Sequence, residues 1–545
     1  MASARLPFSP DPGASASVLA RPSERAWHSP RASWRALIAL LAVGAAIGGL
    51  CSLREARRDM ALAADITTPD SVVVAAALRA RQTGHLYPLW SAPPYTPTPY
   101  GPVYYGAVMA LSEITGTHFA RLVIAARLFT LLCFLGVIAL AGACCRRLEA
   151  GLGWAALAAA LAASDLGFAH WNLTTRPDMT ALLASLAAVW AASGLRNGAG
   201  ALKREIGVSL LLAAAVLSKQ SYIAAPLAIA IWLAAQREWA RLARIASAAL
   251  GTTAVVLGAL AAHGDRVAAN LLALRGARPA VATGIGIVLR SLEDYAPHTL
   301  LLALAAVGLA AAWRASGPGR PARLLALYAM LAWLLGIGML LANSGGGENY
   351  LIEGWAISAV FAAYAVATLS RQWAQTPAAA RALLVIWVAV CMGAGVVAWH
   401  HEAFTAQPAG HGKLAKAVHG WRVLSDVPYL ALQGRDPAYL DPYLLHTLEV
   451  NGRWSSRQLA RSLAAQRFDV LLLDDGTGAV NTVWRGLSHY DAATMAAIAA
   501  HYRPSCASYP VIAFLPTPVP AGALARLEAA GCRPLGSLKI NPAQP

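Results

Sequence analysis

Long apolar segments separated by short, arginine-bearing connections run through most of the chain and limit what it can fold into. Such segments cover about residues 34–53, 122–145, 246–262 and 383–399, among others. An apolar run of about 18 or more residues with few charges is long enough to cross a bilayer as a helix. Only 13% of the 545 residues are charged and 57% are hydrophobic, whereas a soluble domain carries about twice that charged fraction. The sequence therefore predicts a polytopic α-helical membrane protein.

The arginines and lysines give the spans a direction. The pattern predicts about eleven transmembrane helices. Seven of them are expected at 34–53, 122–145, 151–168, 179–195, 222–235, 246–262 and 383–399. The other four are placed by their ends, at about residues 218, 314 and 371 and at the 343–354 loop. Nearly every even-numbered span ends in arginine or lysine, which the positive-inside rule assigns to the cytosol. The N-terminus is then cytosolic, with residues 1–33 as a disordered tail, and the transmembrane domain covers residues 34–400.

The formal net charge of +17 could indicate a nucleic-acid partner. The basic residues gather instead in the connections between spans, where they orient the protein and meet lipid headgroups. We therefore expect membrane lipids as partners and no nucleic acid.

Residues 401–545 change in character. Apolar runs shorten to strand length at 422–424, 469–473 and 511–514, and helical stretches at 456–466 and 492–501 alternate with them. Strands that alternate with helices predict a small α/β domain, and the number of spans places it outside the cytosol. Cys506 and Cys532 both lie in it, and outside the cytosol they could form a disulfide.

Two long polar loops are expected on the outer side, at 54–105 and 263–298. The first holds three aspartates, a short helical run at 71–81 and a proline- and tyrosine-rich turn at 93–105. Membrane proteins usually keep such loops short, so a long, acidic and aromatic one indicates a working part.

Acidic residues from several separate loops gather on the outer face: Asp59, Asp65, Asp70, Asp165, Asp178, Asp265, Glu293, Asp294, Glu348 and Glu353. Arg176 and Lys219 join them at outer helix ends. Cations there could hold a phosphate or pyrophosphate leaving group, and a carboxylate could take a proton from an acceptor hydroxyl. Simpler roles are open: Asp70 and Asp178 follow prolines as helix caps would, and Lys219 could reach the headgroups.

The order of these motifs resembles the GT-C glycosyltransferases, integral-membrane enzymes that use polyprenyl-phosphate sugars. The resemblance rests on an aspartate followed by a short helix, the GHLYP segment, the YGPVYY turn, Arg176-Pro177-Asp178-Met179, Lys219-Gln220 and the ENYLIE segment at 348–353. Within these enzymes the chain is similar to the branch of protein mannosyltransferases and lipid A aminoarabinose transferases, which is glycosyltransferase family 39-like. The resemblance covers about residues 34–400.

The resemblance implies a role for each matching residue. Asp70 stands where the family carries its catalytic acid, although Ser71 replaces the second carboxylate that many members have there. Asp59 and Asp65 are the reserves, and Asp178 matches the acid of the second outer loop. The donor and its phosphate are expected at Lys219, Gln220, Arg176, Glu348, Asn349 and Tyr350, and the acceptor or sugar at Tyr87, Tyr100 and Tyr104.

The sequence thus predicts a membrane glycosyltransferase that moves a monosaccharide from a polyprenyl-phosphate carrier to a lipid, glycan or protein acceptor. The expected place is the periplasmic face of a bacterial inner membrane. The alternative is a polytopic transporter or flippase of lipid-linked sugars, which should show internal repeats and charges near helix middles. Histidines with metal-ligand spacing are absent from the sequence, so we expect no transition-metal site and leave a divalent cation at the phosphate open.

Overall fold

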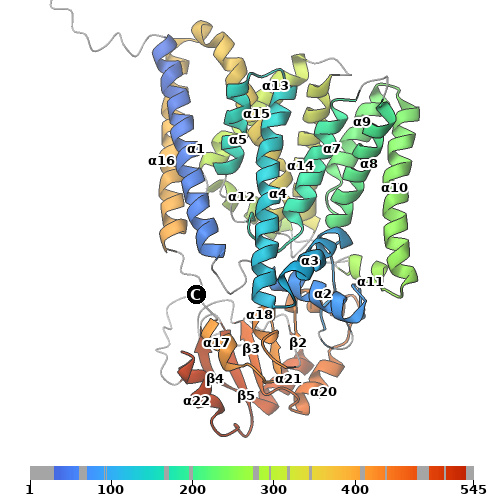
Figure 1. Ribbon diagram of the computed structural model, residues 1–545. Coiled ribbons are helices and arrows are strands. Elements are labelled where there is room, and N and C mark those ends of the chain that lie inside the picture. Colours follow the sequence, from blue (N-terminus) through green and yellow to red (C-terminus); the bar gives the residue numbers. More distant parts are fainter. Residues whose placement is uncertain are drawn as a thin grey trace, which may run out of the picture.

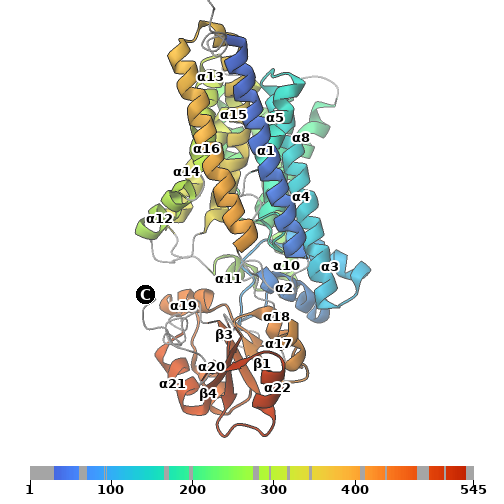
Figure 2. The ribbon, with the colours of Figure 1, turned by 90° about the vertical axis from the view of Figure 1, so that its left-hand side faces the viewer.

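The computed structural model describes residues 30–535, apart from residues 61–69, 91–92, 94, 165–170, 196–199, 274–280, 294–295, 316–319, 343–346, 406–411, 436–437, 475–489 and 509–510. A long helical bundle forms one part, and a small α/β domain lies against one end of it (Figures 1 and 2). The N-terminal end of α1 lies at the opposite end of the bundle (Figure 1).

Each predicted span overlaps one helix of the bundle. These helices are α1 (Pro30–Met60), α4 (Phe119–Arg147), α5 (Leu152–Ser164), α7 (Asp178–Ala192), α8 (Ala201–Ser218), α9 (Ala224–Ala235), α10 (Trp239–Ala262), α13 (Ala296–Ala315), α14 (Pro321–Ala342), α15 (Ile352–Gln372) and α16 (Ala378–Thr405). Among the described residues, five helices are long and apolar enough to cross a membrane. The prediction of a multi-pass membrane protein is confirmed.

Helix α15 forms the centre of the bundle. Its residues from Ile352 to Phe361 are all buried, and it packs against α4, α5, α13 and α14. Helix α10 lies at the edge and leaves Leu250 and Val255 exposed. Such an apolar outer surface suits lipid chains and not water.

The two long outer loops contain more helix than the sequence indicated. Helix α1 continues to Met60, so the first residues of the 54–105 loop extend the span. The short run expected at 71–81 is α2 (Asp70–Thr83), and α3 (Pro102–Thr115) follows the tyrosine-rich turn. In the 263–298 loop lie α11 (Val267–Leu271) and α12 (Val281–Glu293). Helices α2, α3 and α11 lie between the bundle and the C-terminal domain (Figures 1 and 2).

The C-terminal domain is a six-stranded sheet with helices, as predicted. Its strands are β1 (Val423–Ser425), β2 (Ala438–Tyr439), β3 (Val470–Asp474), β4 (Tyr502–Ser508), β5 (Val511–Pro516) and β6 (Arg533–Pro534), in the order β2-β1-β3-β5-β4-β6. Strand β1 pairs in parallel with β2 and β3, and the other pairs are antiparallel. The helices are α17 (Gly412–Ala417), α18 (Pro428–Ala431), α19 (Pro442–Val450), α20 (Arg457–Ala464), α21 (Ala492–His501) and α22 (Ala523–Ala529).

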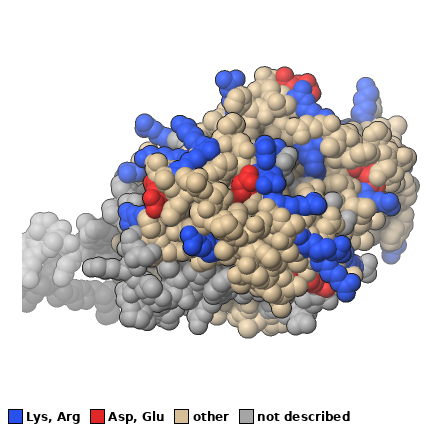
Figure 3. All heavy atoms as spheres, turned by 90° about the horizontal axis from the view of Figure 1, so that it is seen from below, with Lys and Arg blue, Asp and Glu red and all other residues tan. Residues whose placement is uncertain are grey.

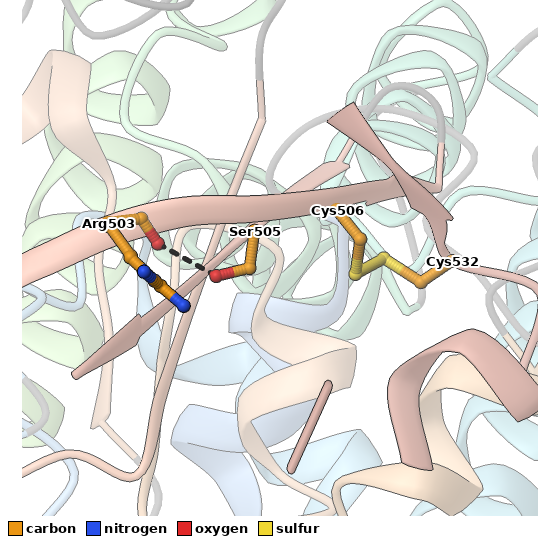
Figure 4. Close-up of a disulfide and its surroundings, with 4 residues drawn as sticks. All are labelled: Arg503, Ser505, Cys506 and Cys532. Carbon is orange, nitrogen blue, oxygen red and sulfur yellow. Dashed lines mark hydrogen bonds between the residues drawn. A yellow bond between two sulfur atoms is a disulfide. The ribbon is translucent and has the colours of Figure 1, made fainter. Parts of the chain in front are cut away.

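Cys506 and Cys532 form a disulfide, with a Cα–Cα distance of 5.5 Å (Figure 4). The bond joins β4 to the residue just before β6, at the edge of the sheet. The pairing that the sequence suggested is therefore confirmed.

Candidate functional site

A buried group of charges lies where the N-terminal end of α7 and the C-terminal end of α8 meet the short 3-10 helix η1 (Glu348–Tyr350). We call Arg176, Asp178, Lys219 and Asn349 the charged centre. Lys219 Nζ donates a hydrogen bond of 2.5 Å to Asp178 Oδ1, and Asn349 Nδ2 donates one of 3.1 Å to the same oxygen. Arg176 Nε lies 3.4 Å from Asp178 Oδ2. The side chains of Asp178 and Lys219 are only 1% and 5% exposed.

These contacts bear on the simpler roles considered for two of the residues, a helix cap for Asp178 and contact with lipid headgroups for Lys219. Asp178 is the first residue of α7, and its carboxylate accepts hydrogen bonds from the side chains of Lys219 and Asn349, which lie outside that helix. Lys219 follows the last residue of α8 and is paired in the protein interior, so it does not reach for headgroups. Two cations share one carboxylate here, which leaves a net positive charge suited to a phosphate.

Close backbone packing brings η1 to the charged centre. A Cβ atom at Gly336 of α14 would lie 2.5 Å from the Tyr350 carbonyl oxygen, so only glycine lets η1 approach this helix. Asn349 is then buried beside Asp178, and the Tyr350 ring centroid lies 4.9 Å from Lys219 Nζ. Glu348 is partly buried in the same 3-10 helix.

Aromatic rings enclose both cations. The Tyr222 ring lies 5.9 Å from Lys219 Nζ, and the Trp171 ring lies 5.1 Å from Arg176 Cζ. Arg176 also donates a hydrogen bond of 2.9 Å to the Tyr100 hydroxyl. Rings at these distances stabilise a desolvated cation through their negative faces. They also hold the cations in place without neutralising them.

Residues 95–101 of the first outer loop, which we call the strap, end at the charged centre. Gln220 Nε2 donates a hydrogen bond of 2.7 Å to the Pro99 carbonyl oxygen. The Gly101 amide donates one of 3.2 Å to the Ser218 carbonyl oxygen, and a Cβ atom at Gly101 would lie 2.0 Å from the Leu217 carbonyl oxygen. The strap therefore lies directly on the outer end of α8.

The three predicted tyrosines have different surroundings. Tyr100 contacts the charged centre through Arg176. Burial raises its pKa above the ordinary value, and the Asp178 carboxylate adds to the rise, so it stays a neutral hydroxyl at neutral pH. Tyr87 is buried and donates a hydrogen bond of 2.8 Å to the Tyr100 carbonyl oxygen. Tyr104 lies on α3, where its hydroxyl meets Thr130 Oγ1 of α4 at 3.1 Å. Among the hydrogen bonds given above for these three tyrosines, the one between Tyr100 and Arg176 is the one that reaches the charged centre.

Glu353 of α15 is a further carboxylate near the charged centre. It lies about one turn beyond η1, is 7% exposed and accepts hydrogen bonds of 2.5 Å from Ser185 Oγ and 2.9 Å from the Tyr328 hydroxyl. The sequence shows it as an acidic residue at the start of an apolar span, a position that often marks function. Its two hydroxyl partners could not be found from the sequence, because they come from α7 and α14.

The predicted catalytic acids of the first loop are placed only by their backbone. Asp70 is the first residue of α2, and Asp59 lies near the end of α1. Their side chains, and the whole of Asp65, lie outside the described residues. Among the residues that are described, no group of three or more His, Cys, Asp or Glu side chains could hold a metal ion.

An apolar cavity of about 280 Å³ lies beside η1, between α12, α13, α14 and α15. Its lining includes Leu351, the residue after Tyr350, together with Trp333 and Trp355. Ser358 is the one polar side chain that contributes to it. A cavity of this character suits a hydrocarbon chain.

The face of the C-terminal domain that points away from the bundle carries more basic than acidic side chains (Figure 3). Exposed arginines lie on α20, β4, α22 and β6: Arg457, Arg461, Arg503, Arg526 and Arg533. This distribution favours contact with anionic groups over contact with cations.

Searches with protein-family models and among curated proteins find no match. Solved structures do match. ArnT from Cupriavidus metallidurans in the apo state has a TM-score of 0.55 at 11% identity, over 89% of this chain and 98% of that chain. The same protein bound to undecaprenyl phosphate has a TM-score of 0.53 at 13% identity, over 88% and 97%. The Archaeoglobus fulgidus oligosaccharyltransferase in the apo form has a TM-score of 0.52 at 11% identity, over 86% and 73%. This likeness shows that the chain shares the fold of these proteins, which is the fold that the order of its motifs led us to expect.

Proposed function

We propose that this protein is a membrane glycosyltransferase. It would transfer a monosaccharide from a polyprenyl-phosphate carrier to a hydroxyl group of a lipid, glycan or protein. The observation that carries the proposal is the charged centre, in which a buried lysine and an arginine that is 12% exposed share one carboxylate. One of the structures with a similar fold is ArnT bound to undecaprenyl phosphate, and another is an oligosaccharyltransferase.

The position of the charged centre supports a lipid-linked phosphate as ligand. Lys219 and Arg176 lie at one end of an apolar bundle. The Tyr350 ring contacts Lys219, and the next residue, Leu351, lines the apolar cavity. A polyprenyl phosphate needs both features, a cationic site for the phosphate and an apolar surface for the chain. A free sugar phosphate would need only the first.

In the proposed reaction the acceptor hydroxyl attacks the anomeric carbon of the donor sugar. The bond between this carbon and the phosphate oxygen breaks, and polyprenyl phosphate leaves with the electron pair. Asp70 accepts the proton of the hydroxyl as general base. Lys219 and Arg176 stabilise the charge that develops on the leaving phosphate, and Asp178 with Asn349 holds Lys219 in position.

We place this reaction on the outer face of a bacterial inner membrane. One arginine-bearing connection lies at the end of α8 away from the charged centre: Glu205, near the start of α8, pairs with Arg241 and Arg244 near the start of α10, whereas Lys219 follows the last residue of α8. The disulfide in the C-terminal domain suits an oxidising compartment such as the periplasm.

The test is a transfer assay in membranes that contain the wild-type protein or the Asp70→Asn variant. A labelled pool of polyprenyl-phosphate sugars supplies the donor, and label is followed into lipid, glycan and protein fractions. The proposal predicts transfer by the wild type and loss of transfer in a variant that still folds. Equal transfer by both proteins would exclude Asp70 as the base. Absence of transfer by the wild type from every donor would contradict the proposed function.

A further inference from the structure

The strap is attached to the C-terminal domain at its first residues. Tyr95 is 1% exposed, and its ring lies within the apolar core of that domain, among residues that include Leu424, Leu459 and Leu463. Its hydroxyl lies 3.5 Å from Ser462 Oγ of α20. The next residue, Thr96, donates a hydrogen bond of 2.9 Å from Oγ1 to the Tyr439 carbonyl oxygen of β2.

The backbone at Tyr95 supports a specific role for this attachment. Its φ is +63°, in the left-handed region that residues other than glycine rarely adopt. A bulky residue remains in such a conformation only where its surroundings hold it there, and these positions often accompany functional constraint. The ring buried in the C-terminal domain supplies that hold.

Every following part of the strap is fixed until it reaches the charged centre. Arg79 of α2 donates hydrogen bonds to Thr98 Oγ1 at 3.0 Å and to the Tyr439 hydroxyl at 3.4 Å. The Thr98 amide donates a hydrogen bond of 2.7 Å to Asn270 Oδ1 of α11. Gln220 then holds Pro99, and Arg176 holds Tyr100.

The sequence of the strap, YTPTPYG, makes it stiff. Pro97 and Pro99 fix their own φ angles and hold the preceding residues extended. A displacement at Tyr95 is therefore transmitted to Tyr100 and not absorbed by rotation within the strap.

The C-terminal domain also approaches the other end of the strap. Asp441 follows β2 closely and is 9% exposed. Its carboxylate lies near enough to Tyr100 to add to the rise in the pKa of that hydroxyl, of which burial is the larger cause. The domain thus contacts the strap at Tyr95 and Thr96 and acts on Tyr100 as well.

From these contacts we propose that Tyr95 is a positioning residue, through which the C-terminal domain sets the place of Tyr100 and Arg176 at the charged centre. The C-terminal domain is then a working part of the site and not an appendage. The activity test of this inference rests on the proposed function, whereas a second measurement does not depend on activity.

The activity test compares Tyr95→Ala with two other variants of the full chain. Tyr95→Phe keeps the anchoring ring and loses only the hydroxyl. Ile498→Ala removes a buried side chain from the same apolar core, on α21, and changes no residue of the strap. We expect kcat/KM for the lipid-linked donor to fall at least 10-fold in Tyr95→Ala and to recover to within about threefold of the wild type in Tyr95→Phe. Ile498→Ala should stay within the same threefold range. A rate in Tyr95→Ala close to that of the wild type, or equal losses in Tyr95→Ala and Ile498→Ala, would overturn the inference.

The independent measurement is amide hydrogen exchange by mass spectrometry, without substrate. Tyr95→Ala should increase exchange in peptides that cover 96–101 and 171–178, while Ile498→Ala should increase it only within the C-terminal domain. Unchanged exchange at 171–178 in Tyr95→Ala would contradict the inference even if the protein proved to be a transporter. An inactive wild type with the expected exchange pattern would count against the proposed function alone.

Discussion

Removing the carboxylate of the charged centre should destabilise the protein more than removing one of its cations. Asp178→Asn leaves Lys219 and Arg176 buried close to each other with no anion between them. Lys219→Met leaves Asp178 with Arg176 at 3.4 Å and with the hydrogen bond from Asn349. Breaking a buried ion pair by loss of one partner costs roughly 3–5 kcal/mol, and we expect Asp178→Asn near the upper end of this range and Lys219→Met near or below the lower end.

The double variant Asp178→Asn/Lys219→Met separates the ion pair from its surroundings. In the double variant Arg176 is the one cation left in the charged centre, so two positive charges no longer lie close together without an anion. Its loss of stability should therefore be smaller than the sum of the two single losses. Unfolding of the purified proteins in detergent, followed by denaturant titration, measures all three. Additive losses, or a less stable Lys219→Met than Asp178→Asn, would refute the contact geometry on which this reasoning depends.

Activity should separate from stability in the same three variants. A charge-assisted hydrogen bond from Lys219 to a phosphate contributes about 1.5–3 kcal/mol, so Lys219→Met should lower kcat/KM about 10- to 150-fold. The double variant should regain stability but no activity, because the phosphate-binding cation is still missing.

Three shorter predictions concern packing and the C-terminal domain. Gly101→Ala should destabilise the protein and abolish transfer because its Cβ atom would collide with the α8 backbone. Gly106→Ala on α3, with nothing within 4 Å of the added atom, should instead keep or raise the unfolding midpoint in the same thermal-unfolding assay, because alanine favours a helix interior over glycine. Replacing Cys506 and Cys532 by serine should cost about 2–4 kcal/mol for a loop that spans 26 residues, seen as a lower unfolding midpoint that reductant no longer changes. Partial burial acts to raise the pKa of Asp469, but hydrogen bonds from Arg422 outweigh this effect and lower the pKa. The carboxylate therefore stabilises the fold above about pH 4. The difference in unfolding free energy between Asp469→Asn and the wild type should fade as the pH falls below that value.

The helical bundle could be predicted because length and composition act locally. A run such as residues 122–145 is apolar enough to identify α4 without any knowledge of its neighbours, and Arg146 at its end gives the direction. The disulfide and the strands β1, β3 and β5 were predictable for the same reason. Strands β2 and β6 have two residues each, and β4 contains a proline and a bulge, so they carry no comparable signal.

The contacts within the candidate site could not be predicted from the sequence. Asp178, Lys219 and Asn349 meet although they lie at three separate elements, and the sequence shows each of them only as a polar residue near the end of an apolar span. The contact between the hydroxyl groups of Tyr104 and Thr130 also crosses a helix interface that no local pattern indicates. The anchoring of Tyr95 depends on a domain more than 300 residues further along the chain, as its neighbour Ser462 shows, and no local pattern indicates it.

The central claim is that the protein transfers a sugar from a polyprenyl-phosphate carrier by means of the charged centre. The most direct measurement uses proteoliposomes with the purified protein, a labelled polyprenyl-phosphate sugar and a mixture of extracted envelope acceptors. For the wild type, the claim predicts label on an acceptor together with an equal amount of free polyprenyl phosphate, and for Lys219→Met a rate of formation of both products that is about 10- to 150-fold lower. Label that crosses the bilayer while still attached to its carrier, with no free polyprenyl phosphate formed, would contradict the claim and identify a transporter.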